Sequence, residues 1–484
     1  MNYRMILRII GYILFMEAFL MLPGAVISWF DGEPDVVRAY MISIAIILVV
    51  GALFTWTGRK ARKGFYAREG FVTTGLSWLV MSALGCLPFW ISRQIPSYVD
   101  CMFEMVSGFT TTGSSILSNV EGLSRGLLYW RSFSHWVGGM GVLVFLMAIV
   151  PLSGKNGGFT LHILRAESPG PSVGKMVPRM KKTALILYLI YTGLTVIDFI
   201  LLCLAGMPVF DAFCHAVGTA GTGGFGVRND SLAGYSPAAQ TITTVFMFLF
   251  GVNFSCYYLI LLKRFKDVFH DEELRAYLLI IFASIAVISF NIRGLYGSLG
   301  EAIHHAAFQV GTVMSTTGFA TADFDLWPAL SKSIMLILML GGACAGSTGG
   351  GLKIARFVLM LKALRRNIHE NLHPTEVRRV KMNGQGVDEK VLANLHGYLI
   401  AYVGILIISF LIISLDGFSM ETNISAVFAT FNNIGPGFGA VGPTMNYYAY
   451  SNLSKIVMIF NMLAGRLEIM PMLVLFSRTT WRTK

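Results

Sequence analysis

The chain has 484 residues, of which 55% are hydrophobic and only 13% are charged, with a formal net charge of +12. A soluble domain carries about 25% charged residues, so this chain lacks the polar side chains to cover a water-facing surface of that size. The composition therefore excludes an ordinary soluble enzyme or binding domain and indicates an integral membrane protein.

Ten apolar runs approach the roughly 20 residues that a helix needs to cross a bilayer. The first run follows Arg4 and Arg8, as in a signal peptide, but it is too long and lacks an A-x-A-like cleavage site, so we interpret it as a retained helix. Ten crossings place both termini on one side of the membrane. The expected spans are 5–29, 38–57, 71–91, 127–151, 183–206, 238–262, 275–291, 329–361, 395–415 and 453–476.

Most of the 38 basic residues lie at the termini and in alternate connections, such as 57–70 and 353–390. The positive-inside rule places these segments, and both termini, in the cytoplasm. The positive charge therefore does not indicate nucleic acid binding. It offers a docking surface for anionic membrane lipid or for an acidic peripheral protein.

Four glycine-containing breaks follow the first two spans, and each comes after a stretch too short to cross a membrane. Such stretches predict re-entrant helices. An acid lies near the start of each stretch, where the helix dipole is positive. The breaks are FTTTGSS (109–115), GTGGFG (221–226), STTGFAT (315–321) and NNIGPGFG (432–439), and the acids are Asp100, Asp211, Glu301 and Glu421.

This pattern predicts an all-α integral membrane protein in which membrane-pore-membrane repeats surround one pseudo-fourfold pore. Residues 1–69 would form two extra N-terminal transmembrane helices. The third repeat would contain a broken second helix. The four repeats are expected at 70–155, 176–268, 272–366 and 392–484.

Non-helical backbone at membrane depth is tolerated only inside protein or beside a watery cavity, so the breaks should converge on a path. Rings of backbone carbonyls suit K⁺, and glycine permits the backbone angles that point them inward. The breaks contain no ring of carboxylates, which argues against a divalent-cation filter. We predict a K⁺ filter formed by Thr111, Thr112, Gly113, Thr222, Gly223, Gly224, Thr316, Thr317, Gly318, Asn433, Ile434 and Gly435.

Two breaks depart from the common pattern. The second contains adjacent glycines, Gly223 and Gly224, which leaves the filter glycine there open by one position. The fourth has Asn433 and Ile434 before Gly435 and contains no threonine. We therefore expect an only approximately fourfold ring with fewer good ion sites than a symmetric channel.

The run 329–361 would span about 50 Å as one straight helix, against a hydrocarbon core of roughly 30 Å. Its middle, GGACAGSTGGG, is a poor helix sequence. We predict a broken helix whose middle enters the cavity as a gate, with tight small-residue helix packing as the alternative. Lys353 would face either the cavity or the cytosol. The gate residues are Gly346, Ser347, Thr348, Gly349, Gly350, Gly351, Lys353 and Arg466.

Three ionisable residues lie within predicted spans, where charge is costly and by default functional. Arg466 would place a positive charge under the filter; the alternative is an ion pair with Glu17 or Asp198. Glu17 and Asp198 themselves are expected to be buried carboxylates with satisfied partners, and proton coupling is the alternative. The six cysteines and the histidines show no metal-ligand spacing or nucleophile–base pattern, so we expect no enzyme.

Further motifs are WRSFSHWVGGMGVLVF (130–145), GGACAGSTGGGLKI (341–354) and GRLE (465–468). Together with the four breaks, they make the chain resemble the bacterial Trk-type potassium uptake subunits of the Trk/Ktr/HKT superfamily over nearly its whole length. The resemblance implies K⁺ as the transported ion, selected by the four glycines. Gly113 favours K⁺, because some plant relatives have serine there and pass Na⁺.

The resemblance also implies a multi-pass protein of the bacterial cytoplasmic (inner) membrane that forms a homodimer. It implies a partner, a cytosolic nucleotide-binding regulatory subunit of the TrkA type, and no organic cofactor is expected in this chain. The leading hypothesis is gated, channel-like K⁺ uptake driven by the membrane potential. A proton- or sodium-coupled K⁺ symporter is the alternative.

Overall fold

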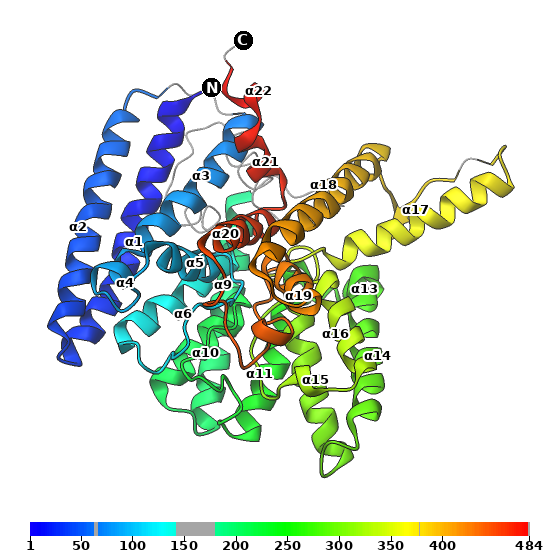
Figure 1. The fold of residues 1–484 in the computed structure, drawn as a ribbon. Helices are drawn as coiled ribbons and strands as arrows, with labels where there is room; N and C mark the ends of the chain where they lie inside the picture. Colours follow the sequence, from blue (N-terminus) through cyan, green and yellow to red (C-terminus); the bar gives the residue numbers. More distant parts are fainter. Residues whose placement is uncertain (62–65, 142–179, 377, 483–484) are drawn as a thin grey trace.

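The computed structural model describes residues 1–61, 66–141, 180–376 and 378–482. Helices make up nearly all of its regular structure (Figure 1). Three predictions fall outside the described residues: the end of the 127–151 span, the end of the first repeat at 155 and the start of the second at 176. The largest buried apolar cluster joins the N-terminal helices to the helices around the first and fourth breaks.

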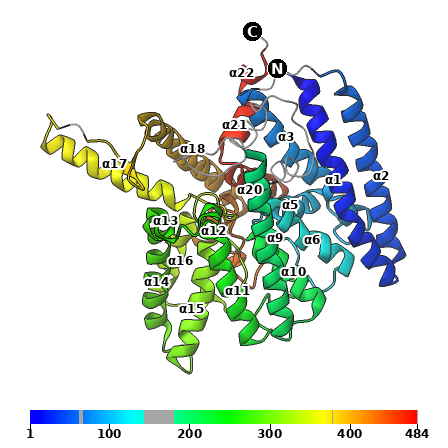
Figure 2. The ribbon, with the colours of Figure 1, turned by 180° about the vertical axis from the view of Figure 1, so that it is seen from behind.

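Two long helices, α1 (Tyr3–Phe30) and α2 (Pro34–Thr57), form a hairpin along one side of the molecule (Figures 1 and 2). Glycine lets them approach closely, because a Cβ added to Gly11 would lie 2.8 Å from the carbonyl oxygen of Gly51. α1 also packs against the helices around the first break. The hairpin therefore supports that part of the protein from outside.

A short helix precedes each of the four glycine-containing breaks, as predicted. The helices have 12 to 16 residues, or roughly 18–24 Å, which is too short to cross a bilayer. Each has its predicted acid in the first turn, and three begin at a serine whose side chain caps the helix. They are α5 (Tyr98–Phe109), α10 (Val209–Gly221), α15 (Leu299–Met314) and α19 (Met420–Phe431).

Other helices stand on either side of these short ones. Around α5 and α10 they are α3 (Ala67–Gly85), α4 (Leu87–Ile91), α6 (Arg125–Gly139), α9 (Met180–Leu204), α11 (Pro237–Phe250) and α12 (Phe254–Leu261). Around α15 and α19 they are α14 (Glu272–Ile292), α16 (Ala329–Gly341), α18 (Glu389–Ile413) and α20 (Asn452–Arg466). The remaining elements are α13 (Phe265–His270), α17 (Ile354–Leu372), α21 (Met470–Phe476), α22 (Arg478–Trp481), η1 (Phe324–Leu326), η2 (Ser414–Asp416) and η3 (Gly439–Val441).

Within the described ranges, six helices are long and apolar enough to cross a membrane, or seven if the bent pair α11 and α12 counts as one span. They correspond to seven of the ten predicted crossings; of the other three, 127–151 ends outside the described residues, and 329–361 and 453–476 are interrupted. The 238–262 run bends by 89° between α11 and α12. The chain leaves the helix at Gly251, and the side chain of Asn253 then caps α12 by accepting a hydrogen bond from the Ser255 amide at 2.9 Å.

Two further runs are interrupted. The 329–361 run is broken, as predicted, because residues 342–353 separate α16 from α17. The 453–476 run was predicted as one span and is also broken, between α20 and α21. Glu468 and Ile469 there have φ angles of 61° and 64°, a left-handed backbone that cannot continue a right-handed helix.

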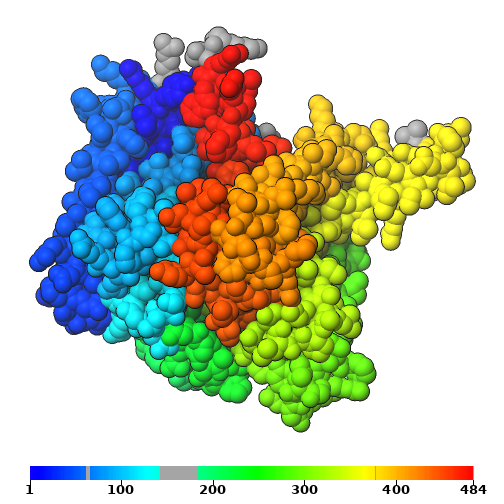
Figure 3. Space-filling model, in the orientation of Figure 1, coloured from blue at the N-terminus to red at the C-terminus, as the bar shows by residue number. Residues whose placement is uncertain are grey.

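A two-stranded hairpin, β1 (Lys381–Met382) with β2 (Gln385–Gly386), corrects the all-α prediction in a small way. Its turn, Asn383 and Gly384, has φ angles of 50° and 76°, the positive values that an Asn-Gly hairpin turn favours. The hairpin packs on α17 and α18, which project from the body of the molecule (Figures 1 and 3).

The two ends of the chain lie together (Figure 1). The rings of Tyr3 and Trp481 stack with their centroids 6.4 Å apart. Arg68, at the start of α3, donates a hydrogen bond to the carbonyl of Arg482 at 3.0 Å. This placement agrees with the prediction that both termini lie on the same side.

Candidate ion pathway

The four breaks share one backbone conformation. In each, a left-handed residue stands two positions before a glycine that also has positive φ. The left-handed residues are Thr111 (φ 55°), Thr222 (53°), Thr316 (57°) and Asn433 (56°). The glycines are Gly113 (79°), Gly224 (77°), Gly318 (95°) and Gly435 (103°). The equivalent glycine of the second break is therefore Gly224 and not Gly223.

These segments, 111–113, 222–224, 316–318 and 433–435, form a closed circle that we call the glycine ring. A Cβ added to any of its four positive-φ glycines would come closer than 3.0 Å to a carbonyl oxygen of the next segment, a separation that real Cβ atoms essentially never show. Both the backbone angle and the neighbouring oxygen thus require glycine. The pairs are Gly113 with Gly223, Gly224 with Thr317, Gly318 with Ile434 and Gly435 with Thr112.

The side chains of the ring are buried and hydrogen-bonded unevenly. Asn433 takes the place that threonine holds in the other three segments. Its amide nitrogen reaches across to the hydroxyl of Thr112 at 2.8 Å, and it also donates to the carbonyl of Met462 at 2.9 Å. The hydroxyl of Thr111 has no hydrogen-bond partner among the described residues. The ring is thus fourfold in its backbone but not in its side chains.

The four short helices end where the glycine ring begins. Because the carboxyl end of a helix carries partial negative charge, these ends favour a cation at the ring. Backbone carbonyls are the ligands that replace the water shell of K⁺ in selectivity filters, and each segment of the ring has one beside a glycine of the neighbouring segment. The geometry therefore suits a large monovalent cation that binds to main-chain oxygens.

Residues 342–353, which we call the inner loop, lie directly against the ring. The amide of Gly350 donates to the hydroxyl of Thr316 at 2.7 Å. A Cβ on Gly350 would lie 2.7 Å from the carbonyl oxygen of Asn432, and one on Gly349 would lie 2.8 Å from that of Ser315. The glycines allow the loop to touch the ends of α15 and α19, which any side chain would prevent.

The inner loop is also tied to the bend between α11 and α12. The amide of Phe254 donates to the carbonyl of Gly346 at 3.1 Å, and the amide of Cys344 donates to that of Gly251 at 3.0 Å. Thr348 adds a hydrogen bond from its hydroxyl to the carbonyl of Phe250 at 3.2 Å. The hydroxyl of Ser347, in contrast, bonds within the loop, to the carbonyl of Cys344 at 2.6 Å.

Two charged residues hold the inner loop. Lys353 is 1% exposed, and its ammonium donates to the carbonyl of Gly349, so of the two alternatives left open for its side chain the cytosol-facing one is wrong. Glu273 of α14 accepts hydrogen bonds from the amides of Ala345 at 2.6 Å and Ala355 at 3.0 Å. The sequence analysis missed Glu273, because an acid in the first turn of a helix is ordinarily a dipole partner.

Arg466, the last residue of α20, bridges the inner loop and α6. Its guanidinium donates to the carbonyls of Thr348, Gly138 and Gly139, each at 2.6 Å. The alternative of an ion pair with Glu17 or Asp198 is wrong, since the carboxylate oxygens of both acids have no hydrogen-bond partner among the described residues.

We expected Glu17 and Asp198 to be buried carboxylates with hydrogen-bond partners. Both are buried, but neither has such a partner among the described residues, so this expectation is wrong. Glu17 is 1% exposed, and its Oε1 would meet a Cβ added to Gly85.

Glu468, just after α20, pairs with Arg356, whose guanidinium also lies 3.9 Å from the ring centroid of Tyr398. This buried ion pair fixes the turn that separates α20 from α21.

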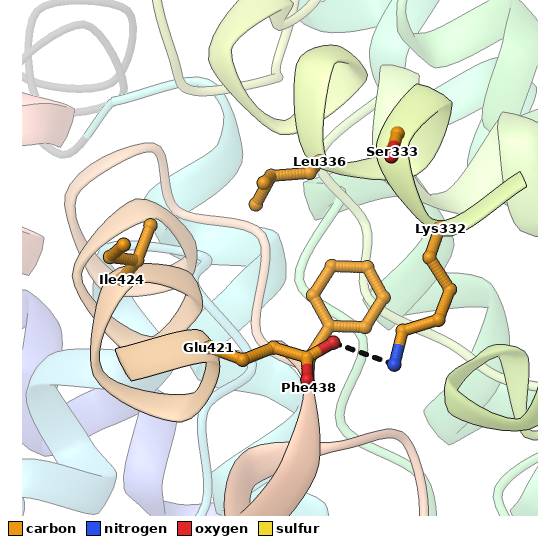
Figure 4. A pocket seen from close by; sticks show the side chains of 6 residues that line it. All are labelled: Lys332, Ser333, Leu336, Glu421, Ile424 and Phe438. Atoms are coloured by element: carbon orange, nitrogen blue, oxygen red, sulfur yellow. Dashed lines mark ion pairs between the residues drawn. The ribbon is translucent and has the colours of Figure 1, made fainter. Parts of the chain in front are cut away.

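A pocket of about 220 Å³ lies between α16 and α19 (Figure 4). The ammonium of Lys332 bridges the carboxylates of Glu421 at 2.6 Å and Asp325 at 2.8 Å. No residue of the glycine ring lines the pocket. The pocket is therefore separate from the ring and lies between the helices that follow the third break and precede the fourth. The lining residues are Lys332, Ser333, Leu336, Glu421, Ile424 and Phe438.

Comparisons with known proteins show which proteins this chain is similar to. The profile of the TrkH family, described as a cation transport protein, matches residues 36–482. The Trk system potassium uptake protein TrkH of Escherichia coli K12 is 35% identical over 100% of both chains, and TrkG of the same organism is 31% identical over 99% of both. The crystal structure of the potassium transporter TrkH from Vibrio parahaemolyticus matches with a TM-score of 0.89 and 31% identity over 100% of both chains.

Proposed function

The chain belongs to the TrkH family of cation transport proteins, and from that premise we propose that it takes up K⁺ through a gated, channel-like path. The membrane would be the bacterial cytoplasmic (inner) membrane, with both termini in the cytoplasm. The membrane potential would drive uptake, since moving a unit charge inward releases about 2.3 kcal/mol per 100 mV. The relatives named above are called potassium uptake proteins, which supports K⁺ as the cargo.

The glycine ring is the observation that carries the proposal. We assign K⁺ coordination to the backbone carbonyls of its four segments, including Thr112, Gly223, Thr317 and Ile434. Each oxygen lies against a glycine of the preceding segment, where a side chain would displace it. Four membrane-pore-membrane units at 70–155, 176–268, 272–366 and 392–484 would surround this pore with pseudo-fourfold symmetry.

The inner loop is proposed as the gate. Its contact with Thr316 and Asn432 places it at the ring, and Arg466 fastens it to α6. The loop has three positive-φ glycines, Gly342, Gly346 and Gly351, which give it a backbone that can rearrange without side-chain strain. Opening would require the Arg466 and Thr316 hydrogen bonds to break.

A proton-coupled K⁺ symporter is the second candidate. The observation that favours it is the pair of buried carboxyls, Glu17 and Asp198, without hydrogen-bond partners among the described residues. Ionisable side chains inside membrane spans are the groups from which proton relays in transporters are built. Both acids lie outside the glycine ring, which makes channel-like conduction the leading proposal.

Purified protein in proteoliposomes tests the two candidates together. We expect K⁺ flux to follow an imposed voltage, to exceed Na⁺ flux and to be unchanged when a pH gradient is imposed at constant voltage. Flux that follows the pH gradient in the native protein, and loses this response in a Glu17→Gln, Asp198→Asn variant, would establish symport instead. Equal K⁺ and Na⁺ fluxes would contradict the potassium filter.

We also propose that the protein forms a homodimer through α17. This helix projects from the body of the molecule (Figure 3) and carries an exposed apolar stripe at helical spacing. The opposite side of α17 already packs on the hairpin and α18. A second copy of the chain would cover the stripe, which consists of Leu361, Leu364, Ile368 and Leu372.

Replacing both Leu364 and Ile368 with aspartate is expected to convert the dimer to monomer, because each buried leucine-sized side chain contributes about 1.5–3 kcal/mol. Native mass measurement in detergent across a concentration series would show at least a hundredfold rise in the dissociation constant. Asn367→Asp, at an exposed polar position of the same helix that is not part of the stripe, is the matched control for the added charge. A dimer that survives the double substitution would place the interface elsewhere.

A cytosolic nucleotide-binding regulatory subunit of the TrkA type is the further partner that we propose. Exposed basic side chains on and after α17, including Arg365, Arg378 and Arg379, offer it an electropositive surface. The same charges would also attract anionic membrane lipid. The regulatory nucleotide would then act on the inner loop through α17, which begins immediately after Lys353.

A further inference from the structure

Two polar residues on α6, Arg131 and His135, lie between the first and second segments of the glycine ring. They are one helical turn apart and therefore on one face of the helix. Both are almost fully buried, with 3% and 0% of their surface exposed. Neither is a candidate for ion coordination, because their polar atoms already bond to other protein groups.

Arg131 uses its guanidinium to join two breaks. Nε pairs with the carboxylate of Glu104 on α5 at 2.6 Å, and Nη2 donates to the hydroxyl of Ser115 at 3.2 Å. Nη1 crosses to the second break and donates to the carbonyl of Gly226 at 2.9 Å, while the guanidinium carbon lies 3.6 Å from the ring centroid of Phe225. One side chain thus fixes backbone just beyond Gly113 and just beyond Gly224.

His135 makes a second link across the same seam. Its Nδ1 lies 2.7 Å from the carbonyl of Gly108, in the last turn of α5, and its Nε2 accepts from the amide of Phe225 at 3.2 Å. This pairing requires a neutral ring that donates from Nδ1. A Cβ added to Gly223 would overlap the imidazole of His135. The imidazole therefore lies directly behind the segment that offers the Gly223 carbonyl.

Charged side chains also join other seams of the ring: Lys455 of α20 pairs with Asp100 of α5 at 2.6 Å, and Lys332 of α16 pairs with Glu421 and Asp325. The fourth and first segments are joined by Asn433 to Thr112 and by the hydroxyl of Ser114 to the carbonyl of Gly435 at 3.1 Å. The second and third segments are joined a few residues further along each chain segment, where the amide of Leu232 donates to the carbonyl of Ala320 at 3.0 Å. What distinguishes the first seam is that its α6 side chains contact Gly223 itself, through the imidazole of His135, and the two residues after Gly224, Phe225 and Gly226.

We propose that Arg131 and His135 are positioning residues that hold the Gly223 carbonyl and so set the discrimination of K⁺ from Na⁺. This inference rests on the proposed potassium filter. It extends that proposal to two residues that coordinate no ion. Their action is indirect: the hydrogen bonds to Gly226 and Phe225 fix the backbone on one side of Gly223, and the imidazole supports Gly223 itself.

Arg131→Lys tests the guanidinium without removing its charge. A lysine keeps the pair with Glu104, but a single ammonium cannot also reach both Ser115 and Gly226 in the fork geometry of arginine. Bi-ionic reversal potentials in planar bilayers are expected to show a K⁺/Na⁺ permeability ratio at least fivefold below that of the native protein. A general loss of stability would lower the number of active channels but not this ratio.

Arg356→Lys is the matched control, since Arg356 is also buried, paired with a glutamate and placed over an aromatic ring, yet contacts no residue of the glycine ring in the interactions found. It is expected to keep the native ratio. His135→Leu should lower the ratio, and His135→Gln should restore at least half of it, because an amide supplies one donor and one acceptor. If Arg131→Lys does not fold, the His135 pair decides the question.

Native ratios in Arg131→Lys and His135→Leu, alongside a lowered ratio in Gly113→Ser, would overturn this inference and leave the potassium filter standing. Native ratios in all three variants would overturn the filter as well. A lowered ratio in Arg356→Lys equal to that of Arg131→Lys would also count against the inference, since any buried arginine would then have the same effect.

Discussion

The Gly113→Ser variant is expected to have a K⁺/Na⁺ permeability ratio about tenfold below that of the native protein. Two physical effects act together at this position. The φ of 79° is unfavourable for any residue with a Cβ, by roughly 1–2 kcal/mol. The new Cβ would also overlap the carbonyl oxygen of Gly223, which must therefore move away from its place in the ring.

A tenfold change corresponds to about 1.4 kcal/mol, which is within the strain that this displacement would introduce. Because K⁺ needs all of its oxygens at the right distance, movement of one of them should affect K⁺ more than the smaller, more strongly hydrated Na⁺. Reversal potentials under bi-ionic conditions measure the ratio directly. The expected change is a fall in K⁺ permeation with a rise in relative Na⁺ permeation.

Gly404→Ser is the matched control for this prediction. Gly404 lies in α18, has no positive φ and has no atom within 4 Å of an added Cβ. The same substitution there should leave the ratio at its native value. An unchanged ratio in Gly113→Ser would exclude the Gly223 carbonyl as a potassium ligand, whatever the effect on total flux.

The glycine ring could be predicted from the sequence because its signals are local. Each break combines glycine with a preceding short apolar stretch and an acid near the start, and α5, α10, α15 and α19 all form as expected. The choice between Gly223 and Gly224 was not local. It depends on backbone angles that only the assembled ring reveals, and these select Gly224.

The broken helices show where local reasoning fails. The 342–353 interruption was predictable from its run of glycines, whereas the break between α20 and α21 depends on Glu468. That residue takes a left-handed backbone and pairs with Arg356, which is 112 positions away in the chain. The apolar run 453–476 contains no comparable cluster of glycines, so hydropathy alone predicted a continuous span.

The partners of Arg466 were equally inaccessible to sequence reasoning. Depth in an apolar run singled it out as a candidate functional residue, and the counter-ions considered as the alternative were acids. The structure instead provides main-chain carbonyls from segments 118 and 328 positions away. Carbonyl oxygens are present at every residue, so no sequence pattern distinguishes the ones that an arginine will contact.

This geometry leads to the second large effect. In the absence of any regulatory subunit, Arg466→Gln is expected to raise K⁺ flux at least tenfold above that of the native protein. The hydrogen bond from Arg466 to Thr348 holds the inner loop, and a bond of this charge-assisted kind contributes about 1.5–3 kcal/mol. Its loss shifts the balance between closed and open loop by roughly ten- to a hundredfold.

Stopped-flow K⁺ flux from proteoliposomes would measure the increase, and Arg466→Lys refines it. A lysine ammonium can bond to Thr348 or to the Gly138 and Gly139 carbonyls, but it lacks the fork that reaches both sides at once. We therefore expect an intermediate flux. Arg478→Gln, at the exposed start of α22, is the control for loss of positive charge alone.

The direction of the change in K⁺ flux shows whether Arg466 is a latch, a residue that holds the inner loop closed, or only stabilises the fold. If Arg466 only stabilised the fold, the glutamine variant would show lower flux together with a lower unfolding temperature. If it closes the path by fastening the inner loop to α6, flux rises while the K⁺/Na⁺ ratio stays near its native value, because the carbonyls of Thr348, Gly138 and Gly139 that it bonds belong to the inner loop and α6 and not to the glycine ring. Lower flux with an unchanged unfolding temperature would show that the arginine assists conduction and would exclude the latch.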